Sequence, residues 1–252
     1  MTKAELRQPI GTGMLYLESA LARAQDPVFE AWVNKHHGEF LANVSGALSV
    51  RRFEWVPTKF SPPAATHPLL TVYQLVDHTA LDGDEYRQHT ANATPMPEGA
   101  GPVTGLRRTI YRQITPASGS CLGKEYEPVD KGQPIGNAVM AVTADVDPEW
   151  EDEANAWYDE EHLPDVAGAP GVLSARRFID RDAPAAPGAQ QAEGRSRFLA
   201  VYELADPSVL DDPAFLEAGK PTPRREKLGT HFCAQLQVYR QVFPDVGAFT
   251  GA

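Results

Sequence analysis

The sequence is poor in cysteine, in basic residues and in long apolar runs, and each shortage excludes a class of protein. Two cysteines, Cys121 and Cys233, are too few for a disulfide framework or a four-thiolate zinc site. Lysine and arginine number 23 against 34 aspartates and glutamates, and the resulting net charge of −11 argues against a nucleic-acid or anionic-membrane partner. No apolar run approaches the roughly 18 residues that span a bilayer, and the first residues lack the apolar segment of a secretory signal. We therefore expect an acidic, cytoplasmic protein.

Common nucleotide and hydrolase signatures are missing as well. The sequence holds no Gly-x-Gly-x-x-Gly, no P-loop and no Gly-x-Ser-x-Gly, so nucleotide-dependent and serine-hydrolase chemistry are not expected. The acidic segment Asp159–Asp165 contains His162, but no second histidine shares a helix face with it, and a solvated acidic helix end is the better interpretation. We expect neither a metal nor another cofactor.

What the sequence does contain is a copy of itself. At an offset of 125 residues, 8–53 lies over 133–178 without a gap, and 14 of 46 positions are identical. The match begins at Gln-Pro-Ile-Gly and ends at Gly-x-Leu-Ser-x-Arg-Arg-Phe in both copies, and it resumes after a small length difference. The 252 residues therefore read as two tandem domains. Their predicted bounds are 8–115 and 133–243, with a linker around 117–132.

The element order is clearest in the second domain. Short apolar segments predict strands over 139–143, 172–179, 198–204 and 232–242. Asp147-Pro148-Glu149 is typical of a helix start, and Leu163-Pro164 predicts the end of that helix, because proline disfavours the helical conformation in the residue before it. A second helix is expected over 207–218, and 180–197 reads as a loop. The first domain gives the same order, with a strand over 14–19 and a proline-rich loop over 56–68.

The order βαββαβ predicts an α+β fold in each half, with an antiparallel sheet that carries both helices on one face, the ferredoxin-like arrangement. The other face of such a sheet would expose an apolar patch of about several hundred Å², which soluble monomers rarely tolerate. Two units packed sheet to sheet within one chain would bury it. We therefore expect a barrel-like interior with room for a ligand.

Two neighbouring segments, Trp157–Pro164 (WYDEEHLP) and Gly171–Phe178 (GVLSARRF), resemble the dimeric α+β barrel superfamily. Within it, the pattern is similar to that of EthD-like and uncharacterised stress-barrel relatives. The first half keeps the tryptophan, histidine and glycine but has Val33, Asn34 and Glu39 where the pattern has tyrosine, aspartate and proline. The resemblance implies the fold. It does not choose a function, because similar barrels serve as isomerases, aromatic cyclases, cofactor-free monooxygenases and haem enzymes.

His162 is the first candidate for chemistry. It follows Asp159 by three residues and Tyr158 by four, so the three side chains are expected on one helix face. A histidine oriented by a carboxylate beside a phenol could move protons on an enol or enone. The alternative is that His162 caps the helix and interacts with its dipole. Its recurrence as His37, without the tyrosine and aspartate, slightly favours that alternative.

The arginine pairs Arg51-Arg52 and Arg176-Arg177 lie on predicted strands, where successive side chains point to opposite faces. One arginine of each pair must therefore point into the barrel and the other under the helices. A buried guanidinium needs a carboxylate of the acidic helix or an anionic ligand. The internal salt bridge is the more common outcome.

Five aromatic or histidine side chains are further candidates to bind the substrate, and His37, the copy of His162 in the first half, is one of them. Trp32 and Trp157 occupy the same position in the two copies, as a lid over a ligand or, more commonly, as core residues. Tyr202 lies on a predicted strand, and His231 stands at the start of the last one. Strand tyrosines are usually packing residues.

Three functions are therefore open. The leading hypothesis is a cofactor-independent isomerase, cyclase or lyase acting on a small apolar or phenolic compound. In it His162 is the base, Asp159 positions it, Tyr158 donates, and Arg176 or Arg177 holds the anion. The alternatives are a non-catalytic ligand-binding protein and a cofactor-free monooxygenase. The chain could also pair as a homodimer.

The charge is uneven between the halves. Residues 1–125 carry 12 basic and 12 acidic side chains, whereas 126–252 carry 11 and 22. Ten of the acids lie from Asp145 to Asp165, within a stretch that has no lysine or arginine. Because this half also keeps the fuller motif, the sequence favours a site there.

Overall fold

The computed structural model describes residues 7–20, 27–62, 64–97, 105–123, 133–183 and 196–244. Most of the predicted 180–197 loop and of the 117–132 linker therefore lies outside the described residues. The long strands of the first half are β2 (Gly13–Ser19), β3 (Ala47–Trp55), β4 (Leu69–Leu75) and β5 (Arg107–Thr115). Those of the second half are β8 (Ala138–Val146), β9 (Val172–Asp180), β10 (Phe198–Leu204) and β11 (Phe232–Phe243).

Within the described chain, these eight strands close into an antiparallel barrel. The ring runs β10-β8-β11-β3-β4-β2-β5-β9, and β9 pairs again with β10. The halves meet twice, where β11 pairs with β3 and where β5 pairs with β9. A short strand, β6 (Cys121–Leu122), adds to β9 outside the ring. Closure removes every free edge from the long strands and gives the sheet an interior.

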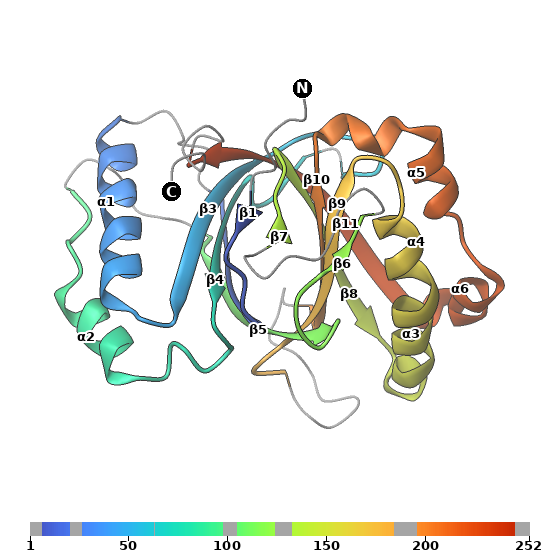
Figure 1. Ribbon diagram of the computed structural model, residues 1–252, viewed down its shortest axis with the longest axis horizontal. Coiled ribbons are helices and arrows are strands. Elements are labelled where there is room, and N and C mark those ends of the chain that lie inside the picture. Colours follow the sequence, from blue (N-terminus) through green and yellow to red (C-terminus); the bar gives the residue numbers. More distant parts are fainter. Residues whose placement is uncertain are drawn as a thin grey trace.

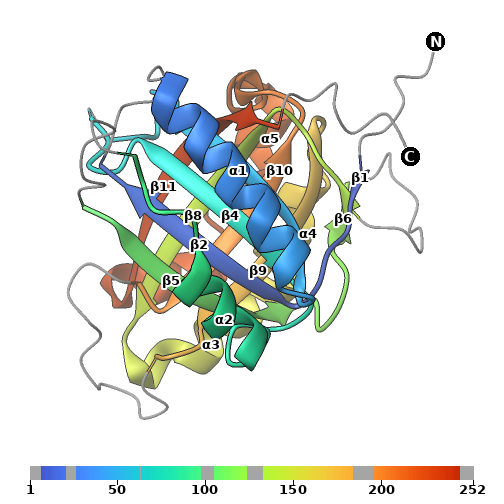
Figure 2. The same ribbon diagram turned by 90° about the vertical axis from the view of Figure 1, so that its left-hand side faces the viewer.

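Helices cover the outside of the barrel on two opposite sides (Figure 1). In the first half these are α1 (Pro27–Asn43), which lies across the strands in Figure 2, and α2 (Asp84–Asn92). The second half has α3 (Glu151–Trp157), α4 (Leu163–Ala167), α5 (Pro213–Ala218) and α6 (Pro223–Leu228). Short helical turns flank them at Pro148–Trp150, Tyr158–His162, Pro207–Asp211 and Gly229–His231. No helix among the described residues has the length and apolar character to cross a membrane.

Two predicted helix bounds are wrong. The helix does not end at Leu163-Pro164, because Tyr158–His162 forms a π-helical turn and the chain continues as α4. The Leu163 amide donates to the Tyr158 carbonyl across this wider turn, and Pro164, which has no N–H to donate, follows directly as the second residue of α4. The second predicted helix, 207–218, is interrupted, because Pro213 starts α5 behind its own cap.

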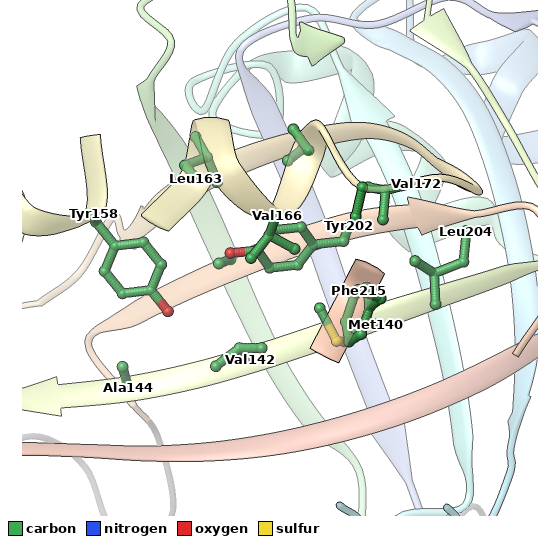
Figure 3. Packing of buried hydrophobic residues seen from close by; sticks show 14 of the residues in the cluster. Met140, Val142, Ala144, Tyr158, Leu163, Val166, Val172, Tyr202, Leu204 and Phe215 are labelled. Atoms are coloured by element: carbon green, nitrogen blue, oxygen red, sulfur yellow. The ribbon is translucent and has the colours of Figure 1, made fainter. Parts of the chain in front are cut away.

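The apolar core has an inner part and two large outer parts, and a small fourth cluster surrounds Phe29 and Val33 of α1. The inner part fills the middle of the barrel and includes Met14, Tyr16, Phe53, Leu70, Tyr111, Val139, Phe178, Leu199 and Tyr239. One outer part packs α1 and α2 against the strands. The other, shown in Figure 3, packs α3 to α5 against the strands of the second half. The division follows from strand alternation, because successive side chains of one strand point in turn into the barrel and toward the covering helices.

The repeated Gln-Pro-Ile-Gly closes one end of the barrel. Its two copies form the short strands β1 (Arg7–Gln8) and β7 (Gln133–Pro134), which pair with each other. A Cβ at Gly11 would lie 2.1 Å from the Leu75 carbonyl oxygen, and one at Gly136 would lie 1.8 Å from that of Leu204. Both copies therefore require glycine for the same close backbone approach.

Candidate functional site

The inward-facing Arg51 organises a polar network behind the β1–β7 ribbon. Arg51 Nη1 donates to Glu203 Oε1 at 2.6 Å, its Nε donates to Gln241 Oε1 at 2.5 Å, and its Nη2 donates to the Gly136 carbonyl at 2.9 Å. Arg51 is 2% exposed and Glu203 is 4% exposed. The expected buried salt bridge is present, but its carboxylate comes from a strand of the other half and not from a helix.

Arg176 is the corresponding inward residue on β9. Its described hydrogen bonds go to neutral acceptors, Gln74 Oε1 at 3.0 Å, Gln113 Oε1 at 3.3 Å and the Gly11 carbonyl at 3.3 Å. Burial lowers the pKa of Arg176 to about 10, and the charge of Glu203 opposes that shift. Both guanidinium groups are thus held by protein acceptors.

The middle of the barrel is packed with the inner core. A gap beside Gln8 and Arg51 measures about 10 Å³, roughly the space that one water needs. This end of the barrel therefore has no room for an organic ligand.

The opposite end of the barrel holds a cavity of about 360 Å³, within the range of organic-ligand sites. The strand pairs β2/β5 and β8/β11 form two of its walls, and they lie on opposite sides of the ring. Its lining residues are Tyr16, Glu18, Thr66, Arg107, Thr109, Tyr111, Ala141, Thr143, Asp145, Ser196, Gln235 and Gln237. Most are polar, so the cavity suits a ligand with several hydrogen-bonding groups better than a wholly apolar one.

The β2/β5 wall carries the reactive groups. Glu18 stands directly opposite Arg107 in the ladder, and Tyr16 stands opposite Thr109. Burial raises the pKa of Glu18 above its usual value, and the positive charge of Arg107 offsets only part of that rise. Burial, followed by the charges of Tyr239 and Glu18, raises the pKa of Tyr16 well above its usual value. Tyr16 therefore remains a hydrogen-bond donor, while Glu18 can take or give a proton.

The β8/β11 wall has the same geometry with uncharged residues at the matching positions. Ala141 stands opposite Gln237, and Thr143 stands opposite Gln235. Ala141 matches Tyr16 of the other wall in register, and its small side chain leaves open the volume that a second tyrosine would fill. The cavity exists because the two walls differ.

The outward arginines behave as ordinary structural residues. Arg52 donates to both carboxylate oxygens of Glu30, at 2.8 and 2.6 Å. Arg177 donates to Asp159 Oδ1 at 2.7 Å and to Asn155 Oδ1 at 2.9 Å. Each tethers a covering helix to the barrel, which is the salt bridge expected from the sequence.

The predicted His162 site lies outside the barrel, between helix and sheet. The ring of His162 stacks on Trp157 at 4.6 Å and meets Tyr158 edge-on at 5.1 Å. Asp159 instead accepts from Arg177 and Thr115. Burial, with Arg225 and Arg177 nearby, lowers the pKa of His162 to about 4, so it is neutral and weakly basic at pH 7. None of these residues lines either described cavity.

The other expected lining residues also lie outside the barrel. Tyr202 is in the outer core (Figure 3), because Glu203 and Val201 take the inward positions of β10. The Trp32 indole donates to the Thr94 carbonyl at 2.9 Å. The remaining two are histidines held by neighbours: His37 Nδ1 lies 2.6 Å from the Tyr73 hydroxyl, and His231 Nδ1 lies 2.7 Å from Asp147 Oδ2.

The expectation of a site in the second half stays a prediction, because six of the twelve lining residues come from each half, while the wall with Glu18 and Arg107 belongs to the first. One local signal for it existed. Glu18 shares the alternation of Met14 and Tyr16, which places a carboxyl on the inward face of an otherwise apolar strand. Arg107 carries no such signal, because its role depends on its partner across the ladder.

Solved structures share this fold at low sequence identity. An anthrone oxidase-like protein matches over 91% of this chain and 90% of its own, at 14% identity and a TM-score of 0.53. A chlorite dismutase variant from Candidatus Nitrospira defluvii matches over 96% of both chains, at 10% identity and a TM-score of 0.52. A haem-bound DypB variant from Rhodococcus jostii matches over 98% of this chain and 99% of its own, at 12% identity and 0.52.

No family model and no curated protein matches the sequence. The structural matches, together with the closed ring of strands, show the fold: it is that of the dimeric α+β barrel superfamily, as the sequence resemblance implied. The narrower EthD-like resemblance stays a prediction.

The haem of the DypB neighbour raises the question of whether this cavity fits one. A haem needs an axial histidine, cysteine, tyrosine or methionine. None of the seven histidines lines the cavity. Tyr16 and Tyr111 do. The effects that raise the pKa of Tyr16 oppose the phenolate that would bind iron, and the Tyr111 hydroxyl donates to the Ser196 carbonyl at 3.5 Å. The described residues therefore do not fit a haem there, and no three histidine, cysteine, aspartate or glutamate side chains among them gather around a possible metal position.

Proposed function

We propose that this dimeric α+β barrel is a cofactor-independent acid–base enzyme that moves a proton on a small phenolic or enolisable compound, with Glu18 as the general base. One observation carries the proposal. A half-buried carboxyl with a raised pKa lines a ligand-sized cavity beside a phenol and a guanidinium. Perturbed carboxyls in clefts are typical of catalytic sites.

The chemistry follows from the donors on the same wall. The Glu18 carboxylate would take a proton from the ligand, and the electron pair would remain on the ligand as an enolate or phenolate. Tyr16 would donate a hydrogen bond to that oxygen in place of the one that it shares with Tyr239, and Arg107 would oppose its negative charge. The protonated Glu18 would then return the proton to a different ligand atom. The net result is a tautomerisation, the simplest isomerase reaction.

A second candidate, cofactor-free oxygenation, shares the first step. A phenolate formed by Glu18 would be the electron-rich species that reacts with O₂. The name of the anthrone oxidase-like neighbour supports this candidate. The third candidate function is a binding protein without turnover. It would use the same cavity, and Glu18 would have no catalytic role in it.

Hydrogen exchange tests the main proposal. A panel of phenols and cyclic enones is incubated with the protein in D₂O, and loss of ring and α-proton signals is followed by ¹H NMR. We expect accelerated exchange for at least one compound, slowed about 10²- to 10⁴-fold by Glu18→Gln. His162→Gln and the matched control Glu54→Gln, on the outward face of β3, should leave the rate unchanged. Equal rates for Glu18→Gln and the wild type, or no acceleration with any compound, would reject the proposal. An oxygen electrode with the same panel separates the second candidate.

We also infer that the chain is a tandem duplication with units 8–115 and 133–243. The 14 identities over 46 ungapped residues support this. So does the matching ladder geometry of β2/β5 and β8/β11. Separate expression of each unit tests it: two related units should form soluble dimers when mixed, because each sheet needs a second one to cover it.

A further inference from the structure

We infer that the 360 Å³ cavity takes an aromatic ring with oxygen atoms on opposite edges, of the hydroquinone type. One oxygen would meet Glu18, and the other would be held by Thr143 and Gln237. The inference rests on the proposed function only in assigning the oxygen that loses a proton to the side of Glu18. The recognition of the second edge depends on the β8/β11 wall alone.

The placement of the walls sets the distance between the two oxygens. In the ring of strands, β2/β5 is separated from β8/β11 by β3 and β4 on one side and by β9 and β10 on the other. The two walls therefore face each other across the barrel. A ligand that hydrogen-bonds to both must carry polar groups at its two ends and not on one edge.

The chemistry of the walls assigns the oxygens. The first wall has a carboxyl and a guanidinium, and it fits the group that loses a proton. The second wall offers the hydroxyl of Thr143 and the amide of Gln237, which fit an uncharged oxygen. Asp145 of β8 also lines the cavity, and its Oδ1 accepts a hydrogen bond from the backbone amide of Arg197 at 2.9 Å, so this carboxylate is held by the protein. The Tyr239 hydroxyl donates to Gln237 Oε1, so the donor end of that amide is the one turned to the ligand.

The cavity floor fits a flat ring. Tyr16 and Tyr111 meet edge to face, with ring centroids 5.9 Å apart at 86°. Aromatic rings in this arrangement leave edges and faces to which another ring can add. Ala141, where the other wall has Tyr16, leaves the space that this third ring would occupy.

Binding measurements with simple probes test the inference. The protein is titrated calorimetrically under argon with hydroquinone, with 4-methylphenol, in which a methyl replaces the second hydroxyl, and with catechol, whose hydroxyls share one edge. We expect hydroquinone to bind about 3- to 10-fold more tightly than either, the worth of one hydrogen bond.

Variants of the second wall locate the effect. Thr143→Val and Gln237→Leu together should make the affinities for hydroquinone and 4-methylphenol equal. The matched control Thr71→Val, on the outward face of β4, should keep the preference. Ala141→Tyr should abolish binding of all three probes by filling the cavity, with the thermal midpoint confirming that each variant folds.

Each result bears on one of the two ideas. Equal wild-type affinity for hydroquinone and 4-methylphenol, a preference that survives both wall substitutions, or equal affinity for catechol would overturn the inference and leave the role of Glu18 standing. If Glu18→Gln keeps the preference for hydroquinone, the inference is supported. If Glu18→Gln also leaves the rate of hydrogen exchange unchanged, only the proposed function is rejected.

Discussion

Arg51 of the first half and Glu203 of the second form a buried ion pair, with Nη1 and Oε1 2.6 Å apart and side chains 3% and 5% exposed. Arg176 is the counterpart of Arg51 in the second half, and it donates to Gln74, which holds the position that Glu203 holds beside Arg51. Two guanidinium groups thus share one carboxylate in the closed end of the barrel. The charge of Glu203 acts on both, since it also opposes the lowered pKa of Arg176.

Glu203→Gln should destabilise the protein by about 3–5 kcal/mol, because it leaves Arg51 buried without a carboxylate. Urea unfolding at pH 7 measures this. As a control, Asp84→Asn breaks an exposed pair with Arg87 and should cost less than about 1 kcal/mol. A loss for Glu203→Gln no larger than that of the control would show that the ion pair does not stabilise the barrel.

Adding Gln74→Glu to Glu203→Gln should restore at least about half of the lost stability, because the new carboxylate would face Arg176 at the mirrored position. The Gln74 amide oxygen already lies 3.0 Å from Arg176 Nη2, so little rearrangement is needed. A double-mutant cycle in urea measures the coupling. Additive losses from the two substitutions would mean that the two arginine positions are not equivalent.

Stability should fall as the pH drops from 7 to 5. Burial lowers the pKa of His37 to about 3 and that of His162 to about 4, with neighbouring arginines adding to both shifts. Unfolded histidine titrates near 6.5, so the unfolded chain binds more protons below that pH, and stability that is full above about pH 6.5 is lost on the way down. We expect a loss of about 2 kcal/mol per histidine between pH 7 and 5.

Urea midpoints across this pH range measure the effect. His162→Gln should reduce the pH dependence by the share of one histidine, and His37→Gln together with His162→Gln should remove the larger part of it. The remainder should come from His36 and His67, whose pKa values burial also lowers. An unchanged slope in the double variant would show that other groups cause the acid sensitivity.

Arg107→Met should raise the pKa of Glu18 further, because the guanidinium that lowers it is removed. A ¹³C NMR titration of the glutamate carboxyl groups measures this, with Glu18→Gln to assign the signal. Arg108→Met is the matched control, since Arg108 points away from the barrel interior on β5 and contacts the ring of Tyr86. A fall in the pKa of Glu18 would contradict the arrangement described for this wall.

Local patterns predicted much of the architecture. The strand 198–204 is found as β10, and the alternation rule correctly predicted that the two arginines of each pair point to opposite faces. Only the structure shows that Arg51 and Arg176 are the inward ones. The helix end at Pro164 was wrong. A proline in a helix removes one backbone hydrogen bond, so its cost depends on the carbonyl that its N–H would have reached. The π turn before Pro164 shifts the hydrogen-bond pairing by one residue, which the sequence pattern does not show.

The candidate site was much less accessible from sequence. The pattern around His162 is contiguous and therefore visible, yet in the fold it packs a helix against the sheet. Glu18 and Arg107 are 89 positions apart in the chain, and Thr143 and Gln237 are 94 apart. They face one cavity only because eight strands close into a ring.

The sequence by itself determined most of the strands and the alternation of faces along each strand, because alternation and helix signals act over a few residues. Only the tertiary structure decided where open space remains. The position of the cavity depends on the difference between the two facing walls, above all on Ala141 where the other wall has Tyr16. These residues meet only after the barrel closes, so the space between them cannot be predicted from local sequence.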